Sequence, residues 1–411
     1  MRQLLADSKW VDKWLFWSLA GLGISCFSRV APNGLEALFF WSLSFASLGT
    51  MISKASLIRA ATCEVLPLTM GWFGLFVLMA LSLLWSPWEQ GTQILFEYRV
   101  LLVSVLVALA IVMSGADYRA LMRLFWFAGF IGVVSLFLKH GGVFDNQLQV
   151  LRPRGSHIIG GLVSSTFVVL SLVLWIEGYG HRLRPFYMLG AILASAEVLF
   201  LEIGRMGFVQ ITAVWLCFGY LAIKGKNHLL WLFGFVIVLV AVLLLSNEII
   251  AGLDRAYQNA KLWGAGAQQY SSMGARLDWI TWAFTKGLEK PLFGVGVGNY
   301  LASIQSAYES GDLRFLTDNL HSEFANIFLM TGAFGIVLFV GHFLIIVWLG
   351  NRSGFRTSGF LATATVGIFL LHCVANSTFK DFGEKNLLVA ILPLVSVYVL
   401  KSYDRVLDVR Q

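Results

Sequence analysis

Apolar runs long enough to cross a bilayer recur from one end of this 411-residue chain to the other. A helix needs about 20 predominantly apolar residues to cross roughly 30 Å of hydrocarbon. The runs are continuous and do not alternate residue by residue, so they predict helices and exclude a membrane barrel. Only 13% of the residues are charged, whereas soluble domains have about a quarter. The chain is therefore predicted to be an all-α polytopic membrane protein.

The apolar runs predict about twelve transmembrane helices and one large polar loop. The predicted division is residues 1–250 with the first nine spans, a loop over residues 251–320, and residues 321–411 with the last three spans. The expected spans lie near residues 14–30, 35–52, 66–85, 96–113, 120–138, 158–176, 186–203, 207–223, 229–250, 321–350, 359–375 and 387–400. A membrane protein with a single loop of this size usually has its working residues there.

Lysine and arginine predict the orientation, because they concentrate in alternate connections between the spans and at both ends of the chain. By the positive-inside rule, both termini are expected in the cytoplasm and the large loop on the outer side of the membrane. The net charge of +7 then reflects topology and does not indicate nucleic-acid binding. The four cysteines stand singly, with neither the spacing of a metal site nor that of a disulfide framework.

The loop itself is predicted to be mostly helical. Residues 247–263 continue the ninth span outward, and Ser271 or Ser272 can cap a helix near residues 273–288. Pro291 ends this helix, and the glycines between 294 and 298 predict a tight turn close to the membrane or to a ligand. The apolar face of the helix is expected at Leu277, Ile280, Thr281, Phe284 and Leu288.

Cations on the outward side of the predicted bundle are the first candidate site residues. Arg205 lies in so short a turn that its guanidinium must be at the membrane boundary, where an arginine is costly unless it is paired. Arg276 lies in the first turn of the loop helix, where the helix dipole favours an acid. A pair with Glu202 would explain Arg205 without a function, and a solvated surface position would explain Arg276. Arg152, Arg154 and Lys380 are candidate supporting cations.

His321 ends the loop and opens the tenth span. It is flanked by Asp318, Asn319, Ser322 and Glu323, and imidazole is the side chain best suited to accept a proton near neutral pH. The alternative is an ordinary interfacial histidine. We interpret His321 as a catalytic base and place Asn319 and Glu323 among the substrate-binding residues.

Several arginines beside a histidine predict a particular chemistry. A rigid guanidinium matches phosphate oxygens, and no acidic cluster suggests a divalent metal. We therefore expect no metal or other cofactor. The arginines would hold a departing diphosphate while the histidine takes the proton of a hydroxyl acceptor.

Three segments in this order resemble the shared region of the O-antigen ligase and polymerase family. They are an arginine-led helix from Arg276, the turn Pro291-Leu-Phe-Gly-Val-Gly-Val-Gly298, and a run from His321 that ends in Gly332-Ala-Phe-Gly335. The resemblance covers residues 271–339. Position 322 is Ser where many relatives have Asn.

The resemblance implies a membrane-embedded, GT-C-like glycosyltransferase that is inverting and independent of metal. Its donor would be a glycan on undecaprenyl diphosphate, and its site would face the periplasm from the inner membrane of a Gram-negative bacterium. Arg276 matches the family's loop arginine, His321 matches its catalytic histidine, and Arg205 matches the arginine expected just outside the seventh span.

A single late external loop favours a ligase, which joins the glycan to a sugar of lipid A–core in lipopolysaccharide biosynthesis. An O-antigen polymerase remains the alternative within the family, and transfer to capsule or glycoprotein by the same chemistry also stays open. A lipid-glycan transporter is the alternative from another class, although such proteins tend to show repeated halves.

Overall fold

The computed structural model describes residues 8–28, 34–140, 157–178, 181–201, 205–224, 254, 257–266 and 271–410. These residues form helices joined by turns, and none of them is in a strand. The all-α class is therefore confirmed for the described part of the chain.

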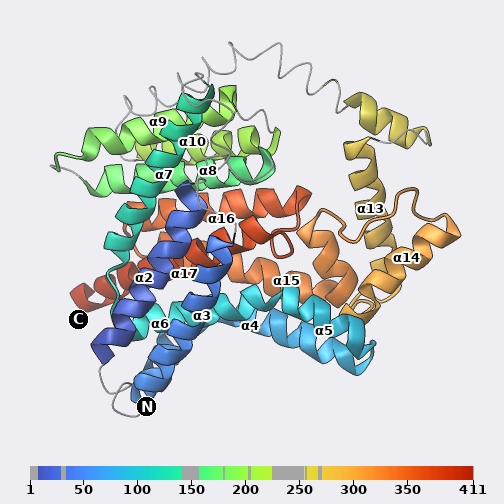
Figure 1. Cartoon of the computed structure of the whole chain (residues 1–411), viewed down its shortest axis with the longest axis horizontal. Coiled ribbons are helices and arrows are strands. Elements are labelled where there is room, and N and C mark those ends of the chain that lie inside the picture. Colours follow the sequence, from blue (N-terminus) through green and yellow to red (C-terminus); the bar gives the residue numbers. More distant parts are fainter. Residues whose placement is uncertain are drawn as a thin grey trace.

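The helices follow the predicted spans closely (Figure 1). Every predicted span except the ninth coincides with a helix, and the ninth, residues 229–250, lies outside the described residues. The bundle helices are α2 (Ser8–Ser28), α3 (Leu35–Ser53), α4 (Ile58–Leu81), α6 (Arg99–Ser114), α7 (Tyr118–His140), α8 (His157–Glu177), α9 (Arg184–Phe200), α10 (Arg205–Lys224), α15 (Glu323–Arg352), α16 (Arg356–Ala375) and α17 (Phe382–Arg410).

Seven segments in the described part of the chain are helical, long and apolar enough to cross a membrane. They are α3, α4 with its short flanking 3-10 turns, α7, α8, α15, α16 and α17. An eighth span results if α5 (Trp88–Glu97) and α6, which meet at an angle of 43°, count as one. These helices point to a multi-pass membrane protein, while the count of twelve remains a prediction.

Helix α17 lies at the centre of the bundle. Every residue from Glu384 to Leu400 is buried, and α17 packs against α2, α6, α15 and α16. In Figure 1, the C-terminal end of α17 lies on one side of the molecule, and α5, α13 (Ser272–Gly287) and α14 (Tyr300–Ser310) lie on the other. The elements of the loop therefore gather at one end of the bundle.

Two of the elements at that end do not follow from the apolar runs. Helices α5 and α14 are short and carry polar residues on much of their surface, so neither resembles a membrane span. Pro87 precedes α5, and Gly311 (φ 83°) ends α14. These turn signals are present in the sequence, but only tertiary packing stabilises helices of this length.

Helix α13 lies where it was predicted, and its expected apolar face is partly buried. Ser271 caps it, because its hydroxyl accepts a hydrogen bond from the Gly274 N–H at 3.0 Å. Ile280 packs against the core, whereas Phe284 is 39% exposed and Leu288 is 66% exposed. The buried face also includes Ala275, Trp279, Ala283 and Gly287. A Cβ on Gly287 would lie 2.6 Å from the Phe328 ring of α15, so the close approach of α13 to α15 depends on small residues as well as on hydropathy.

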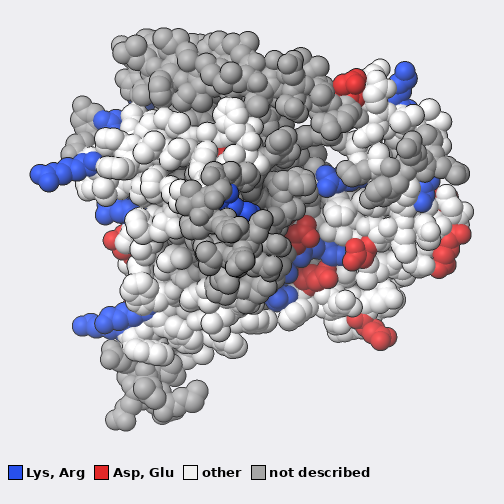
Figure 2. All heavy atoms as spheres, turned by 45° about the horizontal axis from the view of Figure 1, so that its top comes forward, with Lys and Arg blue, Asp and Glu red and all other residues white. Residues whose placement is uncertain are grey.

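Figure 2 shows how sparse the charges are. Much of the described surface in this view is uncharged, while acidic and basic groups lie side by side near the middle of the face. On the face shown, charged side chains of both signs therefore meet mainly near its middle.

Candidate active site

The glycine turn after α13 fits into a break in α15. Gly332 has φ 64° and ψ −157°, which interrupts the helix. The Leu329 and Met330 carbonyls then accept hydrogen bonds from the N–H groups of Val295 (2.8 Å) and Gly296 (3.0 Å). A Cβ on Gly332 would lie 2.5 Å from the backbone of Leu292. The expected tight turn is therefore present, and the backbone it approaches is that of α15.

The other side of this turn is held by the segment that leads into α5. The N–H of Val297 donates to the Ser82 hydroxyl at 3.0 Å, and the N–H of Gly298 donates to the Ser86 hydroxyl at 3.1 Å. The turn is thus anchored in the bundle on both sides, and it fixes α13 before it and α14 after it.

His321 has the only positive φ (50°) among the described residues other than glycine. This conformation costs an L-residue roughly 1–2 kcal/mol. Its N–H donates to the side-chain carbonyl of Asn319 at 3.1 Å, which helps to hold the turn. Strain of this kind is often found where a side chain must be aimed. The His321 ring lies against Trp279, with 5.3 Å between the ring centroids.

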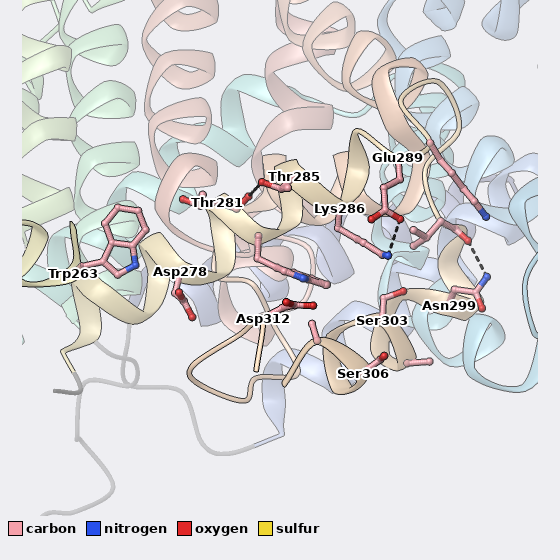
Figure 3. A pocket seen from close by; sticks show the side chains of 15 residues that line it. Trp263, Asp278, Thr281, Thr285, Lys286, Glu289, Asn299, Ser303, Ser306 and Asp312 are labelled. Atoms are coloured by element: carbon pink, nitrogen blue, oxygen red, sulfur yellow. Dashed lines mark hydrogen bonds and ion pairs between the residues drawn. The ribbon is translucent and has the colours of Figure 1, made fainter. Parts of the chain in front are cut away.

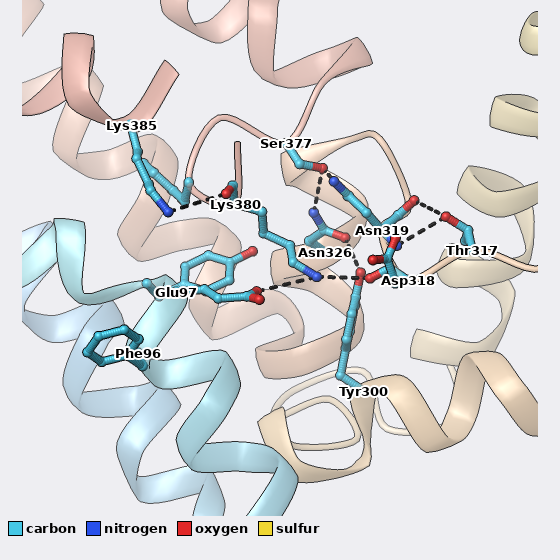
Figure 4. Close-up of polar contacts among 12 residues, drawn as sticks. Phe96, Glu97, Tyr300, Thr317, Asp318, Asn319, Asn326, Ser377, Lys380 and Lys385 are labelled. Atoms are coloured by element: carbon cyan, nitrogen blue, oxygen red, sulfur yellow. Dashed lines mark hydrogen bonds and ion pairs between the residues drawn. The ribbon is translucent and has the colours of Figure 1, made fainter. Parts of the chain in front are cut away.

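A chain of buried hydrogen bonds holds the His321 turn in place (Figure 4). The Ser377 hydroxyl donates to the side-chain carbonyl of Asn319. The amide of Asn326 donates to Ser377 at 2.9 Å, and the Tyr300 hydroxyl donates to Asn326 at 2.7 Å. The turn is therefore connected to α14, to α15 and to the segment between α16 and α17.

Lys380 reaches the same turn from that segment. Its ammonium donates to the Asp318 carbonyl at 2.8 Å and lies 3.4 Å from a carboxylate oxygen of Glu97 (Figure 4). It also lies 5.2 Å from the centre of the Tyr300 ring. Lys380 thus brings a positive charge next to the His321 turn and also holds that turn against α5.

Glu323 and Asn319 are buried, with 0% and 8% of their surfaces exposed. The carboxylate of Glu323 accepts hydrogen bonds from the Tyr98 hydroxyl at 2.6 Å and from the Phe379 N–H at 3.0 Å. Both predicted binding residues therefore contact neighbouring groups of the protein. These contacts suit a role in shaping the site.

The surroundings of His321 favour its neutral form. Burial lowers the pKa of the imidazole, and so do the charges of Arg276 and Lys380. The charges of Asp318 and Glu384 raise it, but by less. Arg276 is therefore close enough to act on His321 electrostatically. It lies in the second turn of α13, not the first, and one turn before Trp279, which contacts the His321 ring.

Arg205 is the first residue of α10. Five residues later, the Gln210 amide lies 3.2 Å from His372, whose other ring nitrogen is 3.0 Å from Glu384. Glu384 is near enough to His321 for its charge to raise the pKa of the imidazole. The contacts from Gln210 through His372 to Glu384 therefore place the first part of α10 at the end of the bundle that carries His321. Arg152, Arg154 and Glu202 lie outside the described residues.

Several residues of this site were not singled out in the sequence. Trp279, Tyr300, Asn326 and Ser377 all contribute to the position of His321. Only Trp279 had a usable signal, because it follows Arg276 by three residues and so shares its side of the helix. The others lie far from His321 in sequence or in apolar surroundings.

No three His, Cys, Asp or Glu side chains converge as a possible metal site within the residues that the structure describes. The chain thus combines a multi-pass helical bundle with a histidine and cations where a polar loop meets the bundle.

Residues 189–340 match the family model for O-antigen ligase, and this match supports the chain as a member of the O-antigen ligase superfamily. The match runs from α9 through α10 and the loop into α15, past its break. No curated protein matches the chain. The family consists of glycosyltransferase-like ligases and polymerases that use lipid-linked glycans.

Proposed function

We propose that the protein is an O-antigen ligase. It transfers O-antigen glycan from undecaprenyl diphosphate to a sugar hydroxyl of lipid A–core, at the periplasmic face of a Gram-negative inner membrane. The observation that carries this proposal is His321, which is strained, half-buried and close to Arg276 at the junction of loop and bundle.

His321 serves as the general base in the proposed reaction. The hydroxyl of the acceptor sugar gives its proton to the neutral imidazole, and its oxygen forms a bond to the anomeric carbon of the donor. The bond between that carbon and the diphosphate oxygen breaks with its electron pair. A single displacement of this kind inverts the anomeric carbon. The lowered pKa of His321 keeps the imidazole free to take the proton at neutral pH.

Arg276 and Arg205 serve to bind the departing diphosphate. A guanidinium offers two parallel N–H donors to phosphate oxygens and remains charged throughout. Negative charge grows on the diphosphate as it leaves, so fixed cations lower the energy of the transition state. Within this proposal no metal ion is needed, and Arg152, Arg154 and Lys380 add positive charge around the site.

The reaction is tested by replacing His321 with Ala in a deletion strain that depends on the plasmid-borne gene. We expect long-chain lipopolysaccharide to disappear and lipid-linked polymer to accumulate, because loss of a general base costs roughly 10²–10⁴ in rate. His181→Ala is the matched control, since His181 lies in the exposed turn before α9. Normal long-chain lipopolysaccharide from the His321→Ala strain would refute the role of the base.

The same strain separates a ligase from a polymerase. A ligase defect leaves the core bare, whereas a polymerase defect still yields core capped with one repeat unit. A transporter defect would instead leave the lipid-linked substrate on the wrong side of the membrane. The late position of the single large loop favours the ligase.

Arg276→Lys tests whether the diphosphate is bound through two parallel hydrogen bonds. Lysine keeps the charge but not the planar fork, so we expect transfer to fall to a small fraction of the wild-type rate. Arg352→Lys, at the far end of α15, is the control. A near-normal rate for Arg276→Lys would mean that charge alone is sufficient.

A further inference from the structure

A groove between α13 and α14 lies beside the candidate active site and has no part in the chemistry described above. Its volume is about 760 Å³, within the usual size range of ligand sites. Trp263 lies at one end of it and Asn299 at the other (Figure 3). We call it the α13–α14 groove, and its lining includes Trp263, Asp278, Thr281, Thr285, Ser303 and Ser306.

Hydroxyl groups line both sides of this groove. Thr281 and Thr285 come from α13, and Ser303 and Ser306 come from α14 (Figure 3). A hydroxyl can both donate and accept a hydrogen bond. A lining of this kind suits a ligand that itself carries many hydroxyl groups.

The charges of the groove do not suit a diphosphate. Lys286 is paired with Glu289 at 2.7 Å. Asp278 accepts hydrogen bonds from the backbone N–H of Arg314 at 2.9 Å and from its guanidinium at 3.1 Å. The lining as a whole holds more acidic than basic side chains. The groove therefore differs from the cationic surroundings of His321, and an uncharged ligand fits it better.

Two tryptophans also line the groove, and each is half-buried. The flat face of an indole packs against apolar C–H groups, while its N–H can donate a hydrogen bond. The indole N–H of Trp263 is buried and has no hydrogen-bond partner among the described residues. In Figure 3 this nitrogen lies on the side of the ring that faces Asp278. Indoles together with hydroxyls are suited to a sugar ring, which has apolar faces and a polar edge.

A short stretch of chain connects the groove to His321. Asp312 lines the groove, and Arg314 binds Asp278. The next carbonyl, that of Phe315, accepts a hydrogen bond from the Trp279 indole at 2.7 Å. Trp279 in turn lies against His321. The groove and the site therefore occupy neighbouring faces of α13, and one extended ligand can reach both.

We propose that the α13–α14 groove binds an oligosaccharide whose reacting end lies at His321. This inference rests on the proposed glycan transfer and adds where the rest of a sugar chain is held. The occupant is either the glycan of the donor or the oligosaccharide of the acceptor, because both present the same chemistry to the groove.

Blocking the groove tests this proposal. Ser306 lies on α14 and lines the groove, whereas the neighbouring Gln305 is exposed and does not line it. Ser306→Trp should therefore fill the groove, and Gln305→Trp adds the same side chain outside it. Ala302→Trp, one turn earlier on α14, is a second blocking variant in case Ser306→Trp does not fold. The full-length proteins are purified in nanodiscs, and their melting temperatures confirm folding.

The probes are two oligosaccharides without lipid or diphosphate: O-antigen fragments and core oligosaccharide. Each is titrated against each protein by calorimetry. We expect one probe to bind the wild type and Gln305→Trp equally, and the blocked variants at least about tenfold more weakly, equivalent to about 1.4 kcal/mol. The probe that shows this loss identifies the source of the sugar chain.

Two results would overturn the groove as a sugar site. One is that neither oligosaccharide binds the wild-type protein, and the other is that the blocked variants bind as tightly as Gln305→Trp. Either result is independent of the His321→Ala experiment. The experiments can thus establish glycan transfer and refute sugar binding in the groove. They can also establish sugar binding in the groove and refute His321 as the general base.

Discussion

At the scale of single residues, His321 is held in one backbone conformation by neighbouring groups, which a histidine that only faces solvent does not need. The backbone strain at this residue is offset by the hydrogen bond that its N–H donates to Asn319, whose side-chain carbonyl also accepts a hydrogen bond from the buried Ser377. A histidine free to rotate at a membrane surface would need no such support. The support is expected if the ring must meet an acceptor hydroxyl in one geometry, because small misplacements are costly in catalysis.

The charges around His321 predict a pH dependence that two substitutions should move in opposite directions. A general base must be unprotonated, so activity should fall with decreasing pH through the pKa of His321, which burial and the charge of Arg276 lower from its ordinary value. Asp318 raises that pKa, and Asp318→Asn should therefore shift the acidic limb to lower pH. Lys380 lowers it, and Lys380→Met should shift the limb to higher pH.

The measurement is kcat/KM of the purified protein from about pH 5 to about pH 8. The position of the acidic limb is compared rather than its height, because Lys380 also holds the turn in place. If the acidic limbs of both variants lay at the same pH as that of the wild type, the pH dependence would come from a group other than His321.

At the scale of elements, the break in α15 should be essential for the site. A methyl group on Gly332 would lie 2.5 Å from Leu292 and would also need an unfavourable positive φ. We therefore expect Gly332→Ala to cost a few kcal/mol, from roughly 1–3 for strain and roughly 1–3 for overpacking. Gly341→Ala is the matched control in the same helix, because nothing lies within 4 Å of its added methyl.

Thermal unfolding and glycan transfer are measured for both variants. Gly332→Ala should lower the melting temperature and abolish transfer, and Gly341→Ala should leave both close to wild type. If Gly332→Ala kept the wild-type melting temperature and the wild-type rate of transfer, the turn at residues 291–296 would not need the break in α15.

The same elements show what the sequence can reveal and what it cannot. Apolar length predicted the bundle helices, and Ser271 with Pro291 predicted the bounds of α13. Both signals are local. The buried face of α13 is not local, because it depends on how closely α15 approaches. The helices α5 and α14 were missed for the same reason, since packing rather than propensity stabilises them.

The residues of the candidate site likewise include some that the sequence predicts and some that it does not. His321 and Arg276 could be selected because their chemistry is unusual for where they lie in the sequence, and the structure brings them within electrostatic reach. Tyr300 and Ser377 act only through hydrogen bonds across distant parts of the chain. Nothing in a single sequence specifies such pairings.

At the scale of the whole molecule, the orientation in the membrane decides which compartment holds the site. After the break at Gly332, α15 continues for the 20 residues from 333 to 352, or about 30 Å of helix, which is enough to cross the bilayer. Its N-terminal end adjoins His321, and its C-terminal end leads to Arg352 and Arg356. The positive-inside rule predicts that those arginines lie in the cytoplasm, and the candidate site is then expected in the periplasm.

Reporter fusions at two positions test this orientation. A fusion within residues 264–269 should score as periplasmic, and one at Gly354 should score as cytoplasmic. Gly354 suits an insertion, because it is exposed and nothing lies within 4 Å of its Cβ position. The pair controls for expression, since the two fusions lie at opposite ends of one helix. Reversed scores would place His321 in the cytoplasm and remove periplasmic transfer, whereas equal scores would mean that α15 does not cross the membrane.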